Sequence, residues 1–141
     1  MVEKKISSFL DKFDFSENTI NSLSPLVLAY VGDAVYEVYV RVYLVSNGNT
    51  PVHLLHKRSI SFVKAKAQCE IIHRIMNFLT EEELDVVRRG RNAKSGTIPK
   101  NADVTEYKYA TGFESLIGFL YLKKNYERLM YILEISISGG E

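Results

Sequence analysis

Residues 24–48 read SPLVLAYVGDAVYEVYVRVYLVSNG, and this stretch decides the fold. It starts like a helix, because Ser24 can cap the first free N–H groups and Pro25 suits the first helical position. It also stops like one, because Asn47-Gly48 is a common helix C-terminus. The many Val and Tyr residues between these signals would favour a strand by propensity alone. The caps and the length of the stretch instead predict one long helix over residues 26–46.

Helical signals flank this stretch on both sides. Apolar residues at helical spacing predict a short amphipathic helix over residues 2–13. After the long helix, Thr50-Pro51 repeats the Ser24-Pro25 type of start signal. It opens a helical region that reaches about Leu79, with room for one break.

The C-terminal half begins with a predicted capping box. Thr80 and Glu83 have the spacing of such a box, at the start of a helix that ends near Arg91. Glycine, proline and polar residues mark residues 92–101 as a loop. Asp103 with Glu106 suggests another capping box, and helices are predicted over 113–123 and 126–137. We find no repeat or linker, so the prediction is one all-α domain over residues 1–141.

Size and composition fit a single globular domain. The 141 residues are 46% hydrophobic and 25% charged, which is ordinary for a protein that buries its own core. The lone Cys69 excludes an internal disulfide. No signal sequence opens the chain, and no apolar run approaches the roughly 20 residues that a bilayer crossing needs. We therefore expect a cytoplasmic protein.

The net charge of +1 conceals a segregation of charge along the chain. Residues 53–74 and 86–101 together sum to +9, whereas the remainder of the chain sums to −8. Such segregation predicts a basic face, for which a phosphate backbone is an obvious partner. The alternative is that these charges only solvate helix surfaces.

Two carboxylates, Asp33 and Glu114, stand out because each lies in an otherwise apolar helix. A buried carboxylate without a partner is costly, so such residues usually face a counter-charge, a metal or water. Small neighbours such as Gly32 and Gly118 leave room for another backbone or a hydrated ion. Oxygen ligands with retained waters suit Mg²⁺. The alternative is a pair of surface acids, with Asp33 and Glu37 paired to Arg41.

Three segments together resemble the ribonuclease III family. YVGDAVYE (30–37) is similar to the family signature, and GFESLIGFLYL (112–122) is similar to its second acidic segment. The loop RRGRNAKSGTIPKN (88–101) narrows the resemblance to the Mini-ribonuclease III branch. The three agree in order and spacing, and the resemblance covers nearly the whole chain.

The resemblance implies an all-helical endoribonuclease that cuts double-stranded RNA as a homodimer. Asp33 and Glu114 fall on the family's acidic positions, and the resemblance makes both catalytic Mg²⁺ ligands. It further implies maturation of 23S ribosomal RNA precursor ends in a bacterium. A ribosomal protein bound to the substrate is a candidate helper.

The sequence departs from larger relatives in three ways. Ala29 and Thr111 stand where those enzymes carry further acids, which implies weaker metal binding completed by waters and RNA oxygens. No separate RNA-binding domain is expected, so the catalytic dimer must hold the duplex itself, through its phosphates and shape. The residues expected to do so are Lys57, Arg58, Lys64, Lys66, Arg88, Arg89, Arg91, Lys94 and Lys100.

Two other functions are compatible with a basic helical domain. A non-catalytic double-stranded RNA-binding module would use the same basic face but would gain nothing from two acids facing phosphates. A helical nucleotide hydrolase would usually need a denser cluster of acids than this chain offers. A zinc site is not predicted either, because no carboxylate or cysteine completes a ligand pattern with His53, His56 or His73.

Overall fold

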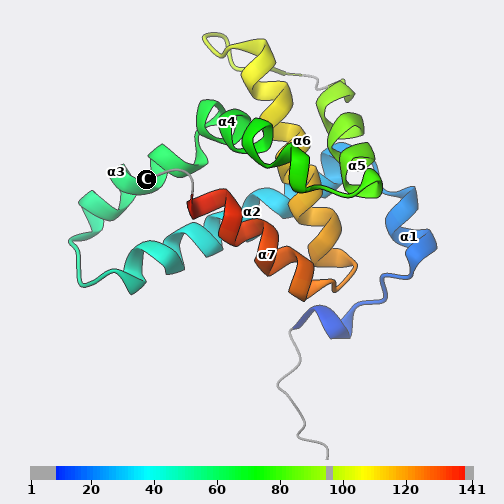
Figure 1. Ribbon diagram of the computed structural model, residues 1–141, viewed down its shortest axis with the longest axis horizontal. Coiled ribbons are helices and arrows are strands. Elements are labelled where there is room, and N and C mark those ends of the chain that lie inside the picture. The colour runs from blue at the N-terminus through cyan, green and yellow to red at the C-terminus, as the bar shows by residue number, and fades with distance from the viewer. Residues whose placement is uncertain (1–8, 95–96, 139–141) are drawn as a thin grey trace, which may run out of the picture.

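The computed structural model describes residues 9–94 and 97–138, and all regular elements within these ranges are helices (Figure 1). The all-α prediction is therefore confirmed. In chain order the elements are η1 (Phe9–Lys12), α1 (Glu17–Ser22), α2 (Pro25–Ser46), α3 (Val52–Val63), α4 (Ala65–Ile75), η2 (Met76–Phe78), α5 (Glu81–Asn92), α6 (Val104–Leu122) and α7 (Tyr126–Ser138). Among the described helices, none combines the length and the apolar character that spanning a membrane requires.

Helix α6 is the central element of the fold. It runs through the middle of the molecule in Figure 1, with α4 and α5 on opposite sides and α2 crossing it. Every residue from Ala110 to Leu120 is buried except Glu114. A helix that is apolar on all sides belongs in a core, and α6 packs its apolar surface against α2, α4 and α5. Glu114 is thus the one position in this segment that remains accessible.

Helices α2 and α6 cross at backbone distance, because each contributes a glycine to the crossing. A Cβ atom added at Gly32 would lie 1.8 Å from the carbonyl oxygen of Glu114. One added at Gly118 would lie 1.9 Å from the carbonyl oxygen of Leu28. Both distances are far below any real contact between such atoms. The close crossing places Asp33, the neighbour of Gly32, beside Glu114.

The predicted helix boundaries are confirmed where side chains cap them. Ser24 Oγ accepts a hydrogen bond from the N–H of Val27 at the start of α2. At the start of α5, Thr80 and Glu83 form the predicted reciprocal capping box. The predicted break in the region after Thr50-Pro51 lies at Lys64, whose extended backbone separates α3 from α4.

Other boundaries differ from the prediction. Of the helix predicted over residues 2–13, positions 1–8 lie outside the described residues, and the rest contains only the 3₁₀ turn η1. Helix α1 was not predicted; its signals are Ser16, which caps the N–H of Thr19, and the buried Ile20. The helix predicted over 113–123 is the second half of α6, which begins at Val104 after its N-cap Asp103.

Candidate active site

The structure brings the two predicted acids together at the crossing of α2 and α6. The carboxyl groups of Asp33 and Glu114 lie close enough for the charge of Asp33 to raise the pKa of Glu114. Asp33 is exposed, whereas Glu114 is half-buried. The pair therefore opens to solvent on the side of Asp33 and is closed by packed helices on the side of Glu114.

The electrostatics of this pair are unfavourable within the protein alone. Burial, and then the charge of Asp33, raise the pKa of Glu114 to about 8, with a smaller contribution from Glu37. Across residues 9–94 and 97–138, neither Asp33 nor Glu114 has a basic ion-pair partner. Two carboxylates that repel each other and expose oxygen atoms are a donor set that suits a hard divalent cation. The residues present therefore fit Mg²⁺.

Few protein ligands are available to such a cation. The described residues contain no group of three or more His, Cys, Asp or Glu side chains arranged around one metal position. Ala29 and Thr111 are both buried, and the Thr111 hydroxyl donates to the Tyr107 carbonyl within α6. Mg²⁺ usually keeps several waters in its coordination sphere, so two carboxylates are a workable protein share.

A third residue of the site, Gln68, was missed by the sequence analysis. It lies on α4, is only 2% exposed, and donates a hydrogen bond from Nε2 to Glu114 Oε2 at 3.1 Å. The signal for it was present in the sequence. Gln68 is the polar member of the buried face that α4 forms with Ile71, Ile72 and Ile75.

The alternative pairing of Asp33 with Arg41 is not what the structure shows. Arg41 Nε instead contacts Glu37 Oε2 at 3.1 Å, one helical turn along α2. Glu37 thus neutralises Arg41, and Asp33 faces Glu114.

The predicted basic residues on α3 and α4 are all exposed: Lys57, Arg58, Lys64 and Lys66. Lys64 forms the junction of the two helices, and Lys66 lies in the first turn of α4. Gln68, which contacts Glu114, is the last residue of the same helical turn. The α3–α4 junction, which carries these two cations, is thus joined to the acidic pair through Gln68.

The basic residues at the end of α5 are partly occupied by contacts within the protein. Arg88 and Arg89 both form ion pairs with Asp85. Arg91 lies over the ring of Tyr109, 5.4 Å from its centroid, and donates a hydrogen bond to its hydroxyl. The Tyr109 ring in turn contacts His73, with centroids 4.3 Å apart. These three arginines are thus less free than their sequence positions suggest.

The basic residues of the loop itself are more available. Lys94 and Lys100 are exposed, and neither has an ion-pair partner in the part of the chain that the structure describes. Lys94 also lines a hollow of about 430 Å³ between the start of α2, the end of α5 and the start of α6. Thr111, three residues before Glu114, lines the same hollow. Ser95 and Gly96 of the predicted loop lie outside the described residues.

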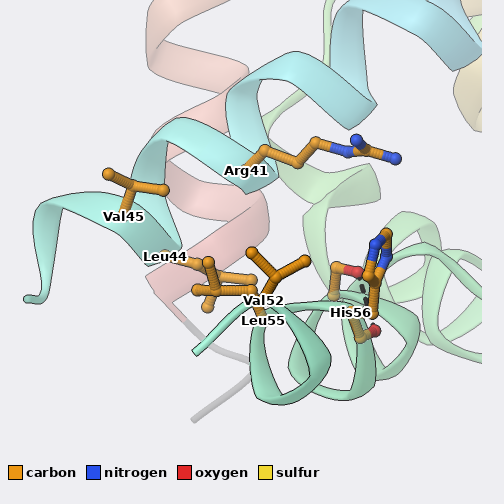
Figure 2. Close-up of a pocket in the computed structure, with 7 residues that line it drawn as sticks. Arg41, Leu44, Val45, Val52, Leu55 and His56 are labelled. Atoms are coloured by element: carbon orange, nitrogen blue, oxygen red, sulfur yellow. Dashed lines mark hydrogen bonds between the residues drawn. The ribbon is translucent and has the colours of Figure 1, made fainter. Parts of the chain in front are cut away.

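A second pocket lies between α2 and α3 and has a different character (Figure 2). It measures about 140 Å³, and its wall is largely aliphatic, from Leu44, Val45, Val52 and Leu55. Figure 2 shows Arg41 and His56 at its rim, with Ser59 donating to the His56 carbonyl oxygen. The hydroxyl of that serine donates to backbone rather than to a side-chain base. We therefore assign the chemistry to the acidic pair.

Comparison with known proteins agrees with the all-helical fold described above. The model of the family described as "Ribonuclease III domain" matches residues 26–125. A Mini-ribonuclease 3 of Thermoanaerobacter sp. (strain X514) is 52% identical over 137 residues, covering 96% of each chain. One from Enterococcus faecalis is 54% identical over 109 residues, covering 76% of this chain and 83% of the relative. A crystal structure of a Fusobacterium nucleatum protein has a TM-score of 0.77 at 38% identity, covering 86% of this chain and 98% of that chain.

Proposed function

This chain belongs to the ribonuclease III family, in its Mini-ribonuclease 3 branch, and we propose that it cuts duplex RNA with Asp33 and Glu114 as catalytic, Mg²⁺-binding residues. As a member of that family it is an endoribonuclease for double-stranded RNA. The site assignment rests on one observation: two carboxylates that lie 81 positions apart in the chain meet without a basic partner among the described residues. We further propose that residues 1–141 form one catalytic domain.

The proposed chemistry divides between the cation and the chain. Bound Mg²⁺ would supply a Lewis acid that activates water and neutralises charge on the phosphodiester. The carboxylate of Asp33 is exposed to solvent, where RNA would approach. The half-buried carboxylate of Glu114 is held from behind by packed helices and by Gln68. The chain thus offers one substrate-facing ligand and one rigidly held ligand.

We propose that the duplex is held through its phosphates by Lys57, Arg58, Lys64, Lys66, Arg88, Arg89, Arg91, Lys94 and Lys100. Duplex RNA is recognised mainly by shape and by phosphate and 2′-hydroxyl contacts, so separated cations suffice. Exposure and the absence of an ion pair among the described residues favour Lys94 and Lys100 in the loop and Lys64 and Lys66 at the α3–α4 junction. Arg88 and Arg89 share Asp85 and so contribute less net charge.

We propose that the protein acts as a homodimer that meets along α2. Val27, Tyr30, Ala34 and Val38 follow one another at helical spacing and are all exposed, with Tyr30 at 81%. An exposed apolar stripe of this kind indicates a protein contact. Asp33 adjoins the stripe, so pairing of two copies along it would bring two acidic pairs to one duplex. Two sites match the two strands to be cut.

For the substrate we propose precursor 23S ribosomal RNA, whose ends the enzyme would mature in the bacterial cytoplasm. A ribosomal protein bound to that RNA would be a partner. Cleavage of a naked precursor transcript, compared with one carrying its ribosomal proteins, tests this part. Cuts at the mature ends support it, and cuts only elsewhere in both substrates contradict it.

The central experiment compares substrates, metals and variants. Purified protein is incubated with duplex RNA, single-stranded RNA and duplex DNA, each with Mg²⁺ and with EDTA. We expect cleavage of duplex RNA alone, dependent on Mg²⁺ and lost in Asp33→Asn and Glu114→Gln. Glu127→Gln, which neutralises an exposed acid on α7, is the matched control and should remain active. Cleavage at the normal rate by either site variant would refute the assignment, and tight duplex binding without cleavage would favour the non-catalytic module.

A further inference from the structure

Gln68 carries a feature that the proposed chemistry does not use. Among the described residues, its Oε1 is the buried side-chain polar atom that has no hydrogen-bond partner. Burying an acceptor without a donor destabilises the fold. An aliphatic side chain would continue the buried face of Ile71, Ile72 and Ile75 without that cost. Stability alone therefore does not explain why the oxygen of this amide is buried without a partner.

The orientation of the Gln68 amide is set by its neighbours. Nε2 donates one hydrogen bond to the Val63 carbonyl at 2.9 Å and one to Glu114 Oε2 at 3.1 Å. The reversed amide would turn its oxygen toward a carbonyl and a carboxylate, both of which are acceptors. Both amide hydrogens are thus committed, and Oε1 is left over beside the acidic pair.

The break between α3 and α4 makes this arrangement possible. Val63 is the last residue of α3, where carbonyl groups have no partner within the helix. The extended backbone of Lys64 then starts α4 in a new direction. The first turn of α4 consequently presents Gln68 both to the end of α3 and to Glu114 on α6. One amide joins three helices at the site.

We propose that Gln68 is a positioning residue for Glu114. Its Nε2 holds Oε2, which leaves the other oxygen of Glu114 directed to Asp33 and a divalent cation, and its Oε1 accepts a hydrogen bond from a water in the site. This inference rests on the proposed function of Asp33 and Glu114.

The test replaces Gln68 and measures metal binding separately from cleavage. Gln68→Leu removes both amide groups at similar volume, and Gln68→Met serves the same purpose if the leucine variant does not fold. Mn²⁺ affinity is measured on the RNA-free protein by the electron spin resonance of free Mn²⁺. The Mg²⁺ concentration that gives half the maximal single-turnover rate is measured at saturating duplex RNA. Melting temperature and duplex affinity are measured in EDTA.

We expect Gln68→Leu to weaken Mn²⁺ binding and to raise the half-saturating Mg²⁺ concentration, each about 10- to 100-fold. Duplex affinity in EDTA should be unchanged. The melting temperature should change little, because loss of the unpaired Oε1 offsets part of the loss of the two hydrogen bonds from Nε2. Ser136→Ala is the control, since Ser136 is also a buried polar residue but bonds within α7. It should match the wild type in both metal measurements.

Two results would overturn the inference. One is wild-type metal affinity and Mg²⁺ dependence in Gln68→Leu or Gln68→Met. The other is full rescue by Gln68→Glu, because an ionised carboxylate offers oxygen atoms but no N–H to Glu114. Asp33→Asn distinguishes failure of the proposed active site from failure of the role of Gln68. If it keeps full activity, the proposed site fails; if it is inactive while Gln68→Leu behaves as wild type, only the role of Gln68 fails.

Discussion

Asp33 and Glu114 have different surroundings although they form one pair. Asp33 is exposed, and Glu114 is half-buried and bonded to Gln68. Replacing either by its amide keeps the shape of the side chain and removes one negative oxygen ligand. We expect a fall in single-turnover cleavage of more than about 100-fold, beyond the usual effect of removing a residue that only supports a ligand. Duplex affinity in EDTA should rise in Asp33→Asn, because a charge that repels phosphate is lost, and should persist in Glu114→Gln, because the raised pKa of Glu114 already keeps this group mostly uncharged at neutral pH.

Glu114 also predicts a pH dependence of stability in the metal-free protein. Its pKa is raised from 4.5 to about 8 in the fold, mainly by burial and then by Asp33. Folding therefore favours the protonated form, and this stabilisation is complete below about pH 4.5 and is lost as the pH rises through about 8. Glu114→Gln lacks the titrating group. In EDTA, calorimetry should show that the melting temperature of the variant rises relative to that of the wild type as the pH increases from 5 to 8.5. A difference between the two melting temperatures that stays constant over this range would contradict the prediction.

Among the elements, the crossing of α2 and α6 is the most sensitive to substitution. In Gly32→Ala the new Cβ would meet the Glu114 carbonyl oxygen at 1.8 Å, which only separation of the two helices can relieve. We expect a loss of about 3 kcal/mol or more in unfolding free energy, at or beyond the upper range for overpacked cores. Cleavage should fall as well, because the crossing sets the distance between Asp33 and Glu114. Gly118→Ala, which strikes the Leu28 carbonyl, should behave alike in urea unfolding, whereas wild-type stability in both variants would mean that the helices do not cross so closely.

On the scale of the whole molecule, the free lysines of the loop predict how RNA binding depends on salt. Lys94 and Lys100 are exposed and make no ion pair within the described residues. The double variant Lys94→Gln/Lys100→Gln should flatten the slope of log affinity against log salt by about two units, roughly one for each lost phosphate contact. The melting temperature should change little. Arg88→Gln should have a smaller effect on the slope, because Asp85 already offsets its charge; an unaltered slope in the double variant would place the RNA elsewhere.

The proposed dimer is a second prediction at this scale. Tyr30→Asp and Val38→Asp each put a charge into the exposed stripe of α2. We expect sedimentation at micromolar concentration to show a dimer for the wild type and a monomer of 16.1 kDa for these variants. Val52→Asp, which alters an equally exposed valine on α3, is the matched control and should remain dimeric. A wild-type monomer that still makes double-strand cuts would contradict the proposal.

The sequence by itself determined the helices whose ends carry their own signals, and the identity of the two acids. Capping by Ser24, Thr80 and Asp103 acts within a single turn, so these starts could be predicted from neighbouring residues. Asp33 and Glu114 were identifiable because each interrupts an apolar helix within a segment that resembles the family. The predicted helix over residues 2–13 lacked such caps, and α1 was too short for its apolar spacing to stand out.

The tertiary structure alone decided which side chains meet. Gln68 reaches Glu114 across 46 positions, and Arg91 reaches Tyr109 across 18. It also decided that Arg41 pairs with Glu37, which leaves Asp33 to Glu114. Which side chains meet depends on how closely the helices cross and at what angle. For α2 and α6 the close approach is possible because Gly32 and Gly118 have no side chain at the crossing. A contact of this kind has no local signal, because its free energy arises only when both helices are already packed.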